Sequence, residues 1–241
     1  MAATTQDAIM LLGDSLTQGS WEQSGISQRL AATYVRKLDV LNRGFSGYQT
    51  DWAIPVFEQV FAKQHEQHHV PKVQLLTIWY GANDAAPPPS VQHVPRDRFK
   101  SNLCGLVNMV KSPASAYYSP DTRIILITPP PVNTHQWEGR NFDETRSYAD
   151  AVKEVGAEVG VPVADIWTEI FDAAGREEKA CEQFLYDGLH LNAAGYDIVF
   201  ESIMKIIADK YPEIHHEKLE TVFVPYVNKI DKSRLQADEY L

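Results

Sequence analysis

A serine, a histidine and an aspartate in this sequence are of the types that nucleophilic acyl chemistry requires. Ser15 follows an apolar run in the segment Gly-Asp-Ser-Leu, and Asp187 and His190 lie three positions apart near the other end of the chain. A serine hydroxyl is a weak nucleophile unless an imidazole accepts its proton, and that imidazole needs a carboxylate to fix its tautomer. The pattern predicts Ser15 as nucleophile, His190 as base and Asp187 as the orienting acid. Each segment alone is equally compatible with a turn or a helix cap.

Two further segments could stabilise the negative charge that develops on a carbonyl oxygen during acyl transfer. Asn83 lies at the end of the most hydrophobic run, and its side-chain amide could donate a hydrogen bond to that oxygen. Gly44 follows another apolar run, where a glycine lets a backbone N–H approach a bound group closely. The structural alternatives are an Asx-turn at Asn83 and a plain tight turn at Gly44.

Together these segments resemble the conserved blocks of the SGNH (GDSL) hydrolases, in order and spacing. The blocks are Gly-Asp-Ser-Leu at 13–16, Asn-Arg-Gly-Phe-Ser-Gly at 42–47, Gly-Ala-Asn-Asp at 81–84 and Asp-Gly-Leu-His at 187–190. The resemblance implies a flavodoxin-like fold and a triad of Ser15, His190 and Asp187. It also implies an oxyanion hole formed by the N–H groups of Ser15 and Gly44 and the amide of Asn83.

Within that family, the chain looks most similar to the isoamyl acetate-hydrolysing esterases. The similarity rests on the extended block at 43–48, on 81–85 and 187–190, and on the overall length. It implies a small-molecule ester substrate with a short, acetate-type acyl group, and no metal or organic cofactor. The alternatives within the family are a thioesterase, a lysophospholipase or a carbohydrate deacetylase. The Pro87-Pro88-Pro89 run departs from the family pattern and could reshape the acyl pocket.

The elements that must position these residues can also be predicted. Short apolar runs that end in polar loops predict five buried parallel strands, at 8–12, 39–42, 73–80, 123–128 and 161–164. Apolar residues at helical spacing over 99–110 and 148–159 predict crossover helices, and Asn192 is a suitable N-cap for a last helix that Pro212 ends. The expected fold is α/β, a three-layer α/β/α sandwich whose ligands bind beyond the carboxyl ends of the strands.

Composition narrows the classes of protein and of partner. The 241 residues are 44% hydrophobic and 22% charged, which is typical of a globular chain. A net charge of −10 argues against nucleic-acid binding, because such binding depends on Lys and Arg neutralising phosphates. No apolar run approaches the roughly 20 residues that cross a bilayer. We expect a cytoplasmic protein without a membrane span, and two free thiols at Cys104 and Cys181.

The chain is expected to form one hydrolase domain, residues 1–211, followed by a tail at 212–241. The segment Val222 to Tyr226 is too apolar to be left in water without reason. We therefore expect the tail to pack on the body or on a second subunit, and the latter would make the protein a homodimer.

The alternative interpretations are a zinc hydrolase, a lipase of the larger α/β-hydrolase fold and a non-catalytic binding module. His65-Glu66-Gln67-His68-His69 matches the zinc motif H-E-x-x-H, but it lies in a polar stretch that Pro71 ends. The G-x-S-x-G elbow of the α/β-hydrolases is absent, since the segment at 44–47 is one residue short of it. A binding module on the same fold would not need nucleophile, base, acid and oxyanion donor together.

Overall fold

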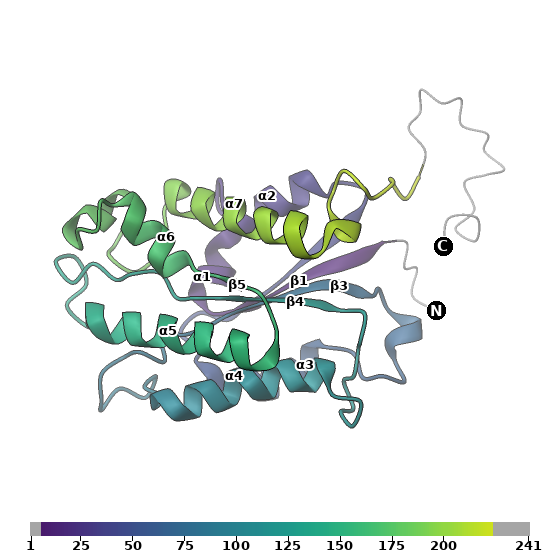
Figure 1. The fold of residues 1–241 in the computed structure, drawn as a ribbon, viewed down its shortest axis with the longest axis horizontal. Coiled ribbons are helices and arrows are strands. Elements are labelled where there is room, and N and C mark those ends of the chain that lie inside the picture. Colours follow the sequence, from purple (N-terminus) through teal and green to yellow (C-terminus); the bar gives the residue numbers. More distant parts are fainter. Residues whose placement is uncertain (1–5, 224–241) are drawn as a thin grey trace.

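The computed structural model describes residues 6–223, which form a parallel sheet between two layers of helices (Figure 1). The five strands are β1 (Asp7–Gly13), β2 (Leu38–Gly44), β3 (Val73–Trp79), β4 (Arg123–Ile127) and β5 (Val163–Ala164). Their order in the sheet is β2-β1-β3-β4-β5, and all neighbours are parallel. The predicted three-layer sandwich is confirmed. β5 is shorter than the predicted strand at 161–164, and Pro162 within that range has no N–H to donate to a ladder.

The helices lie on both faces of the sheet. One face is covered by α2 (Ile26–Thr33), α6 (Ile166–Ala173) and α7 (Ala193–Lys210), and the other by α3 (Thr50–Val60), α4 (Arg96–Lys111) and α5 (Phe142–Val159) (Figure 1). Asn192 caps α7 as predicted, because its side-chain oxygen accepts the N–H groups of Ala194 and Gly195. The shorter helices are α1 (Ser15–Gln18), η1 (Gly19–Trp21), η2 (Gln67–His69), η3 (Lys179–Gln183) and η4 (Pro212–Ile214).

The apolar side chains form one core on each face of the sheet. Along β1, Ile9 and Leu11 pack toward α7, while Met10 and Leu12 pack toward α3 and α4. This alternation follows from the two-residue period of a strand, and every one of these side chains is buried. The sheet is thus held rigidly from both sides, which fixes the loops at its carboxyl edge.

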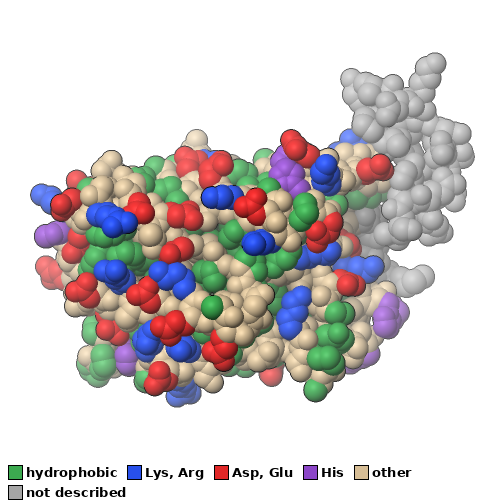
Figure 2. Space-filling view, in the orientation of Figure 1, with side chains coloured by type: hydrophobic (Ala, Val, Ile, Leu, Met, Phe, Trp, Pro, Cys, Tyr) green, Lys and Arg blue, Asp and Glu red, His purple; other side chains and the backbone are tan. Residues whose placement is uncertain are grey.

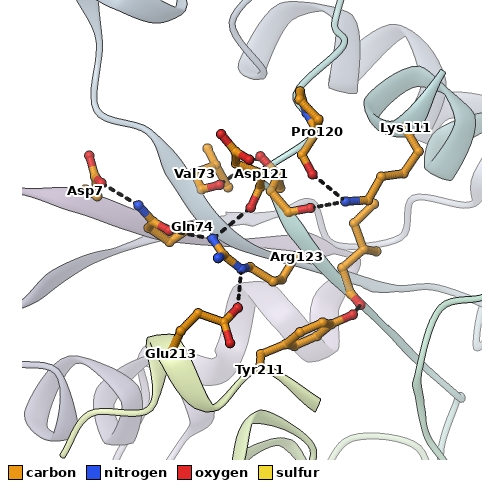
Figure 3. A network of polar contacts seen from close by, with 11 residues as sticks. Asp7, Val73, Gln74, Lys111, Pro120, Asp121, Arg123, Tyr211 and Glu213 are labelled. Carbon is orange, nitrogen blue, oxygen red and sulfur yellow. Dashed lines mark hydrogen bonds and ion pairs between the residues drawn. The ribbon is translucent and has the colours of Figure 1, made fainter. Parts of the chain in front are cut away.

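The amino ends of the strands are joined by a polar network at the opposite edge (Figure 3). Arg123 of β4 donates to Gln74 Oε1 of β3 and to Glu213 Oε1, at 2.8 Å in both cases. Gln74 Nε2 donates in turn to Asp7 Oδ2 of β1, at 2.6 Å. The network connects three strands with η4, the first element of the predicted tail.

The described part of the tail, residues 212–223, lies on the body. Ile214 is buried, Lys37 donates to His216 O, and Val222 N–H donates to Arg36 O at 2.8 Å. Residues 224–226 of the apolar segment lie outside the described residues. Docking of that segment, and the homodimer, therefore stay predictions.

The surface shows no segregation of charge on the face drawn in Figure 2, where acidic and basic side chains are mixed. Among residues 6–223, no helix combines the length and the apolar character needed to cross a bilayer. The H-E-x-x-H segment does not form the α-helix that a zinc site of that type requires. His65 and Glu66 lie in a turn, and only Gln67–His69 has 3-10 helical geometry.

Candidate active site

Three strands end at the same level and bring three of the predicted segments together. In the sheet register, Gly13 of β1 is paired with Gly44 of β2 on one side and with Trp79 of β3 on the other. The loops after these strands therefore start side by side at the carboxyl edge, where ligands bind in folds of this kind. They contain Ser15 and Asn83.

Ser15 is the first residue of α1, directly after β1. Asp14 caps this short helix, because its Oδ1 accepts the N–H of Leu16 at 2.9 Å. Asn42 at the end of β2 donates its amide to Thr17 O, which ties the helix to the neighbouring strand. These bonds fix the direction in which the Ser15 side chain leaves the strand.

The structure brings Ser15, His190 and Asp187 into one hydrogen-bonded chain. His190 Nε2 lies 2.9 Å from Ser15 Oγ, and His190 Nδ1 lies 2.7 Å from Asp187 Oδ2. Burial raises the pKa of Asp187, but hydrogen bonds from the backbone and ring of His190 and from the backbone of Leu189 outweigh it, so the pKa is lowered overall. Asp187 is thus suited to remain a carboxylate beside the imidazole.

Two aromatic side chains confine the His190 ring. Tyr186 is stacked on it, with centroids 5.6 Å apart and an interplanar angle of 18°, and Trp137 meets it edge-on at 5.8 Å. Within this loop, the N–H of Tyr186 donates a hydrogen bond to His190 O at 3.0 Å. The imidazole is therefore held between two rings, and the exposed Tyr186 forms part of the rim of the site.

Gly44 is predicted from the sequence as a backbone oxyanion donor, but its N–H has a partner within the protein. Its N–H donates to Asn42 Oδ1 at 2.9 Å, so this donor is already used. A Cβ atom at Gly44 would lie 2.0 Å from Gln18 N, which shows that the glycine is needed where β2 passes close to α1.

Gly47, three residues later, has the features expected of a backbone donor. Its φ of +80° is favourable for glycine, and its carbonyl oxygen accepts the side chain of Gln92 at 2.9 Å. Among the described residues, none accepts a hydrogen bond from the N–H of Gly47 or from that of Ser15. Both N–H groups are available for a bound oxygen.

Asn83 lies in the loop after β3 with its side chain buried and oriented. Its Nδ2 donates to Tyr48 O at 2.9 Å, which leaves the second proton of the amide unused. Its Oδ1 accepts Gln92 Nε2 at 3.1 Å and Arg140 Nη2 at 3.4 Å. The amide therefore has a fixed direction. Its hydrogen bond to Tyr48 O places it close to Gly47, the residue that precedes Tyr48 in the sequence.

Two buried carboxyl groups lie behind this loop cluster. Burial, together with the nearby charge of Asp84, raises the pKa of Asp14 to about 7 despite the hydrogen bond from Leu16. Burial likewise raises the pKa of Asp84 to about 6, although Thr50 donates two hydrogen bonds to Oδ1. The Oδ2 atoms of both residues have no hydrogen-bond partner among the described residues.

Several residues of the site are not among those that the sequence predicts as catalytic or oxyanion residues. They are Gly47, Gln92, Trp137, Arg140 and Tyr186. Gly47 lies inside the segment at 42–47, which also contains Gly44. The sequence alone does not indicate which of these two glycines has a free N–H. The others lie in loops without periodic pattern and reach the site only through the fold.

Comparison with known proteins identifies the family of the chain. The family model for GDSL-like lipase/acylhydrolases matches residues 11–198. A human isoamyl acetate-hydrolyzing esterase 1 homolog is 36% identical over 214 residues, which cover 84% of this chain and 82% of the relative. The isoamyl acetate-hydrolyzing esterase of Saccharomyces cerevisiae is 30% identical over 234 residues, covering 89% of this chain and 91% of the yeast protein.

Solved structures show the same fold at lower sequence identity. A lipase/acylhydrolase from Enterococcus faecalis has a TM-score of 0.64 and 22% identity, covering 89% of this chain and 98% of that one. A catalytic mutant of an acetylxylan esterase from Geobacillus stearothermophilus has a TM-score of 0.64 and 18% identity, with 88% and 98% coverage. From the family match and the curated relatives together, the chain belongs to the GDSL-like lipase/acylhydrolase family and is an esterase.

Proposed function

We propose that the protein hydrolyses carboxylic esters with short, acetate-type acyl groups, through an acyl-enzyme on Ser15. The observation that supports it most directly is the chain of contacts from Ser15 Oγ to His190 Nε2, at 2.9 Å, and from His190 Nδ1 to Asp187 Oδ2, at 2.7 Å. A structural role would not require a hydroxyl, an imidazole and a carboxylate in this order beside unused N–H donors.

In the first half of the reaction, Ser15 Oγ attacks the ester carbonyl carbon while its proton passes to His190 Nε2. Asp187 stabilises the imidazolium that forms. The negative charge on the carbonyl oxygen is bound by the N–H groups of Ser15 and Gly47 and by the Asn83 amide. We assign the backbone role to Gly47 in place of Gly44, because the Gly44 N–H is engaged by Asn42. The alcohol then leaves with the proton from Nε2.

In the second half, water attacks the acyl carbon and gives its proton to the same nitrogen. The second tetrahedral intermediate breaks the bond to Ser15 Oγ, which recovers its proton from the His190 imidazolium. The products are the carboxylic acid and the free enzyme, so atoms and charge balance without a cofactor.

The acetate-type substrate is supported by the curated human and yeast relatives, whose names contain isoamyl acetate. A panel of p-nitrophenyl esters from acetate to palmitate, with isoamyl acetate beside it, tests this. A methylene that finds no pocket gains none of the roughly 0.8 kcal/mol that its burial would contribute, so kcat/KM should not rise with chain length. A steady rise toward palmitate would favour a lipase or lysophospholipase instead.

The nucleophile is tested with a fluorophosphonate probe and mass spectrometry of the labelled peptide. We expect one adduct on Ser15 in the parent protein and none in Ser15→Ala. The matched control is Ser46→Ala, which removes an exposed hydroxyl from the neighbouring loop and should leave labelling intact. Labelling that persists in Ser15→Ala, or ester turnover at the parent rate in that variant, would refute the proposal.

A further inference from the structure

Arg140, in the loop before α5, reaches the oxyanion donors from behind. Its Nη2 donates to Gln92 Oε1 at 3.1 Å and to Asn83 Oδ1 at 3.4 Å, and its Nε donates to Ala82 O at 3.1 Å. A guanidinium has five donors and no acceptor, and it stays protonated in proteins. Every group that faces it must therefore present an oxygen.

This one-way donor determines the orientation of the Gln92 side chain. Because Oε1 must face Arg140, the NH₂ group of the same amide faces the other way. There Gln92 Nε2 donates to Gly47 O at 2.9 Å and to Asn83 Oδ1 at 3.1 Å. Gln92 thus joins Gly47 and Asn83, the two proposed oxyanion donors that lie outside α1.

The same reasoning extends to Asn83. With Oδ1 occupied by donors from Gln92 and Arg140, the Asn83 NH₂ group must point away from them, toward Tyr48 O and the site. An amide that turned by half a rotation would present its NH₂ to two donors and its oxygen to a carbonyl. Two side-chain amides, which could otherwise flip, are thereby set by one charged group.

We propose that Arg140, together with Gln92, is a positioning residue that points the Asn83 N–H into the oxyanion hole. The positive charge beside Asn83 Oδ1 also polarises the amide, which strengthens its N–H as a donor when negative charge develops on the substrate. The inference rests on the proposed function, because it presupposes that Asn83 binds the oxyanion. It adds two side chains that never contact the reacting atoms.

A purely structural role would be to tie the loop at 84–95 to the loop before α5. Two substitutions of Gln92 separate the roles. Gln92→Glu preserves the shape and can still accept from Arg140, but its carboxylate cannot donate to Asn83 Oδ1 or Gly47 O. The Asn83 amide should then turn its NH₂ toward the new carboxylate and withdraw it from the hole. Gln92→Met removes the hydrogen bonds without imposing a wrong direction.

We therefore expect Gln92→Glu to lower kcat by about 10²-fold, with KM changed little and the melting temperature close to that of the parent. Gln92→Met should cost only about 10-fold, in line with loss of ordinary hydrogen bonds. If Gln92 only ties the two loops together, Gln92→Glu should instead have a higher kcat than Gln92→Met, because Glu retains the hydrogen bond to Arg140. The control is Gln59→Glu, the same substitution at an exposed position of α3.

The closing experiment is a double-mutant cycle with Asn83→Ala on the full chain. If Arg140 and Gln92 act through Asn83, Gln92→Glu and Arg140→Met should each lower kcat by less than about 3-fold in the Asn83→Ala background. Gln92→Glu turning over as fast as Gln92→Met, or full additivity in the cycle, would overturn the inference. If one of these outcomes occurs while Asn83→Ala lowers kcat and the probe labels Ser15, only this inference fails and the proposed function stands. If Ser15 is not labelled in the parent protein, the proposed function fails first.

Discussion

Asp187 engages His190 through both of its carboxylate oxygens. Oδ1 accepts the backbone N–H of His190 at 2.8 Å, and Oδ2 meets the ring nitrogen Nδ1 at 2.7 Å. One carboxylate therefore fixes both the loop and the tautomer of the imidazole, since Nδ1 must carry the proton and Nε2 must be free to accept one.

Asp187→Asn should consequently leave the loop intact and impair the chemistry. The asparagine oxygen would retain the backbone bonds, which forces its NH₂ toward His190 Nδ1 and the ring proton onto Nε2. We expect kcat to fall by about 10⁴-fold with little change in melting temperature. Steady-state kinetics and a thermal melt on one preparation test this. A large loss of stability with normal turnover would show that Asp187 only closes the loop.

Asn83→Ala tests the oxyanion assignment itself. If the amide meets the oxygen only as the carbonyl becomes tetrahedral, kcat should fall by about 10²-fold to 10³-fold with KM nearly unchanged. An Asx-turn role predicts a lower melting temperature with a normal kcat in the folded fraction. Measuring both quantities decides between the two roles.

Gly44→Ala should destabilise the protein because the new methyl group would lie 2.0 Å from Gln18 N, a backbone atom that cannot give way without moving α1. Ser15 begins that helix, so activity should fall with the melting temperature. Gly105→Ala in α4 is the matched control, since a Cβ there meets no atom within 4 Å. It should stabilise by up to about 1 kcal/mol through helix propensity. Equal behaviour of the two variants would contradict the close approach.

The buried Asp14 predicts an unusual dependence of stability on pH. Burial raises its pKa from the ordinary 3.8 to about 7 in the fold, so between about pH 4 and 7 the folded state binds the extra proton. The free energy of unfolding should then fall as pH rises through that window, by about 1.4 kcal/mol per pH unit per proton, and level off above it. Asp14→Asn should flatten the slope in urea titrations, and the exposed Asp209→Asn should not. An unchanged slope in Asp14→Asn would show that this carboxyl is not the source.

The sequence was sufficient for the layers and for the order of the site segments. Buried strands are short continuous apolar runs, and Asn192 has the chemistry of an N-cap, so both are local signals. α3 was not predicted. It contains Pro55, which lacks the N–H that a helix interior uses.

The remainder of the site depends on tertiary contacts that a linear pattern does not contain. Whether Gly44 or Gly47 has a free N–H depends on where the Asn42 side chain points. Gln92 and Arg140 are 48 positions apart and meet only because the loops after β3 and β4 converge. The triad was easier to predict, because the family resemblance assigns its residues one by one.

The candidate catalytic residues and the polar Arg123 network lie at opposite ends of the strands. Ser15 lies beyond the carboxyl end of β1, whereas Asp7 at its amino end belongs to the Arg123 network. β1 has seven residues and is about 23 Å long, so this distance separates the active-site loops from the Arg123 network. Laboratory evolution could therefore randomise the carboxyl-edge loops for a new ester while compensating stabilisation is introduced at the amino edge, with little interference between the two sets of changes.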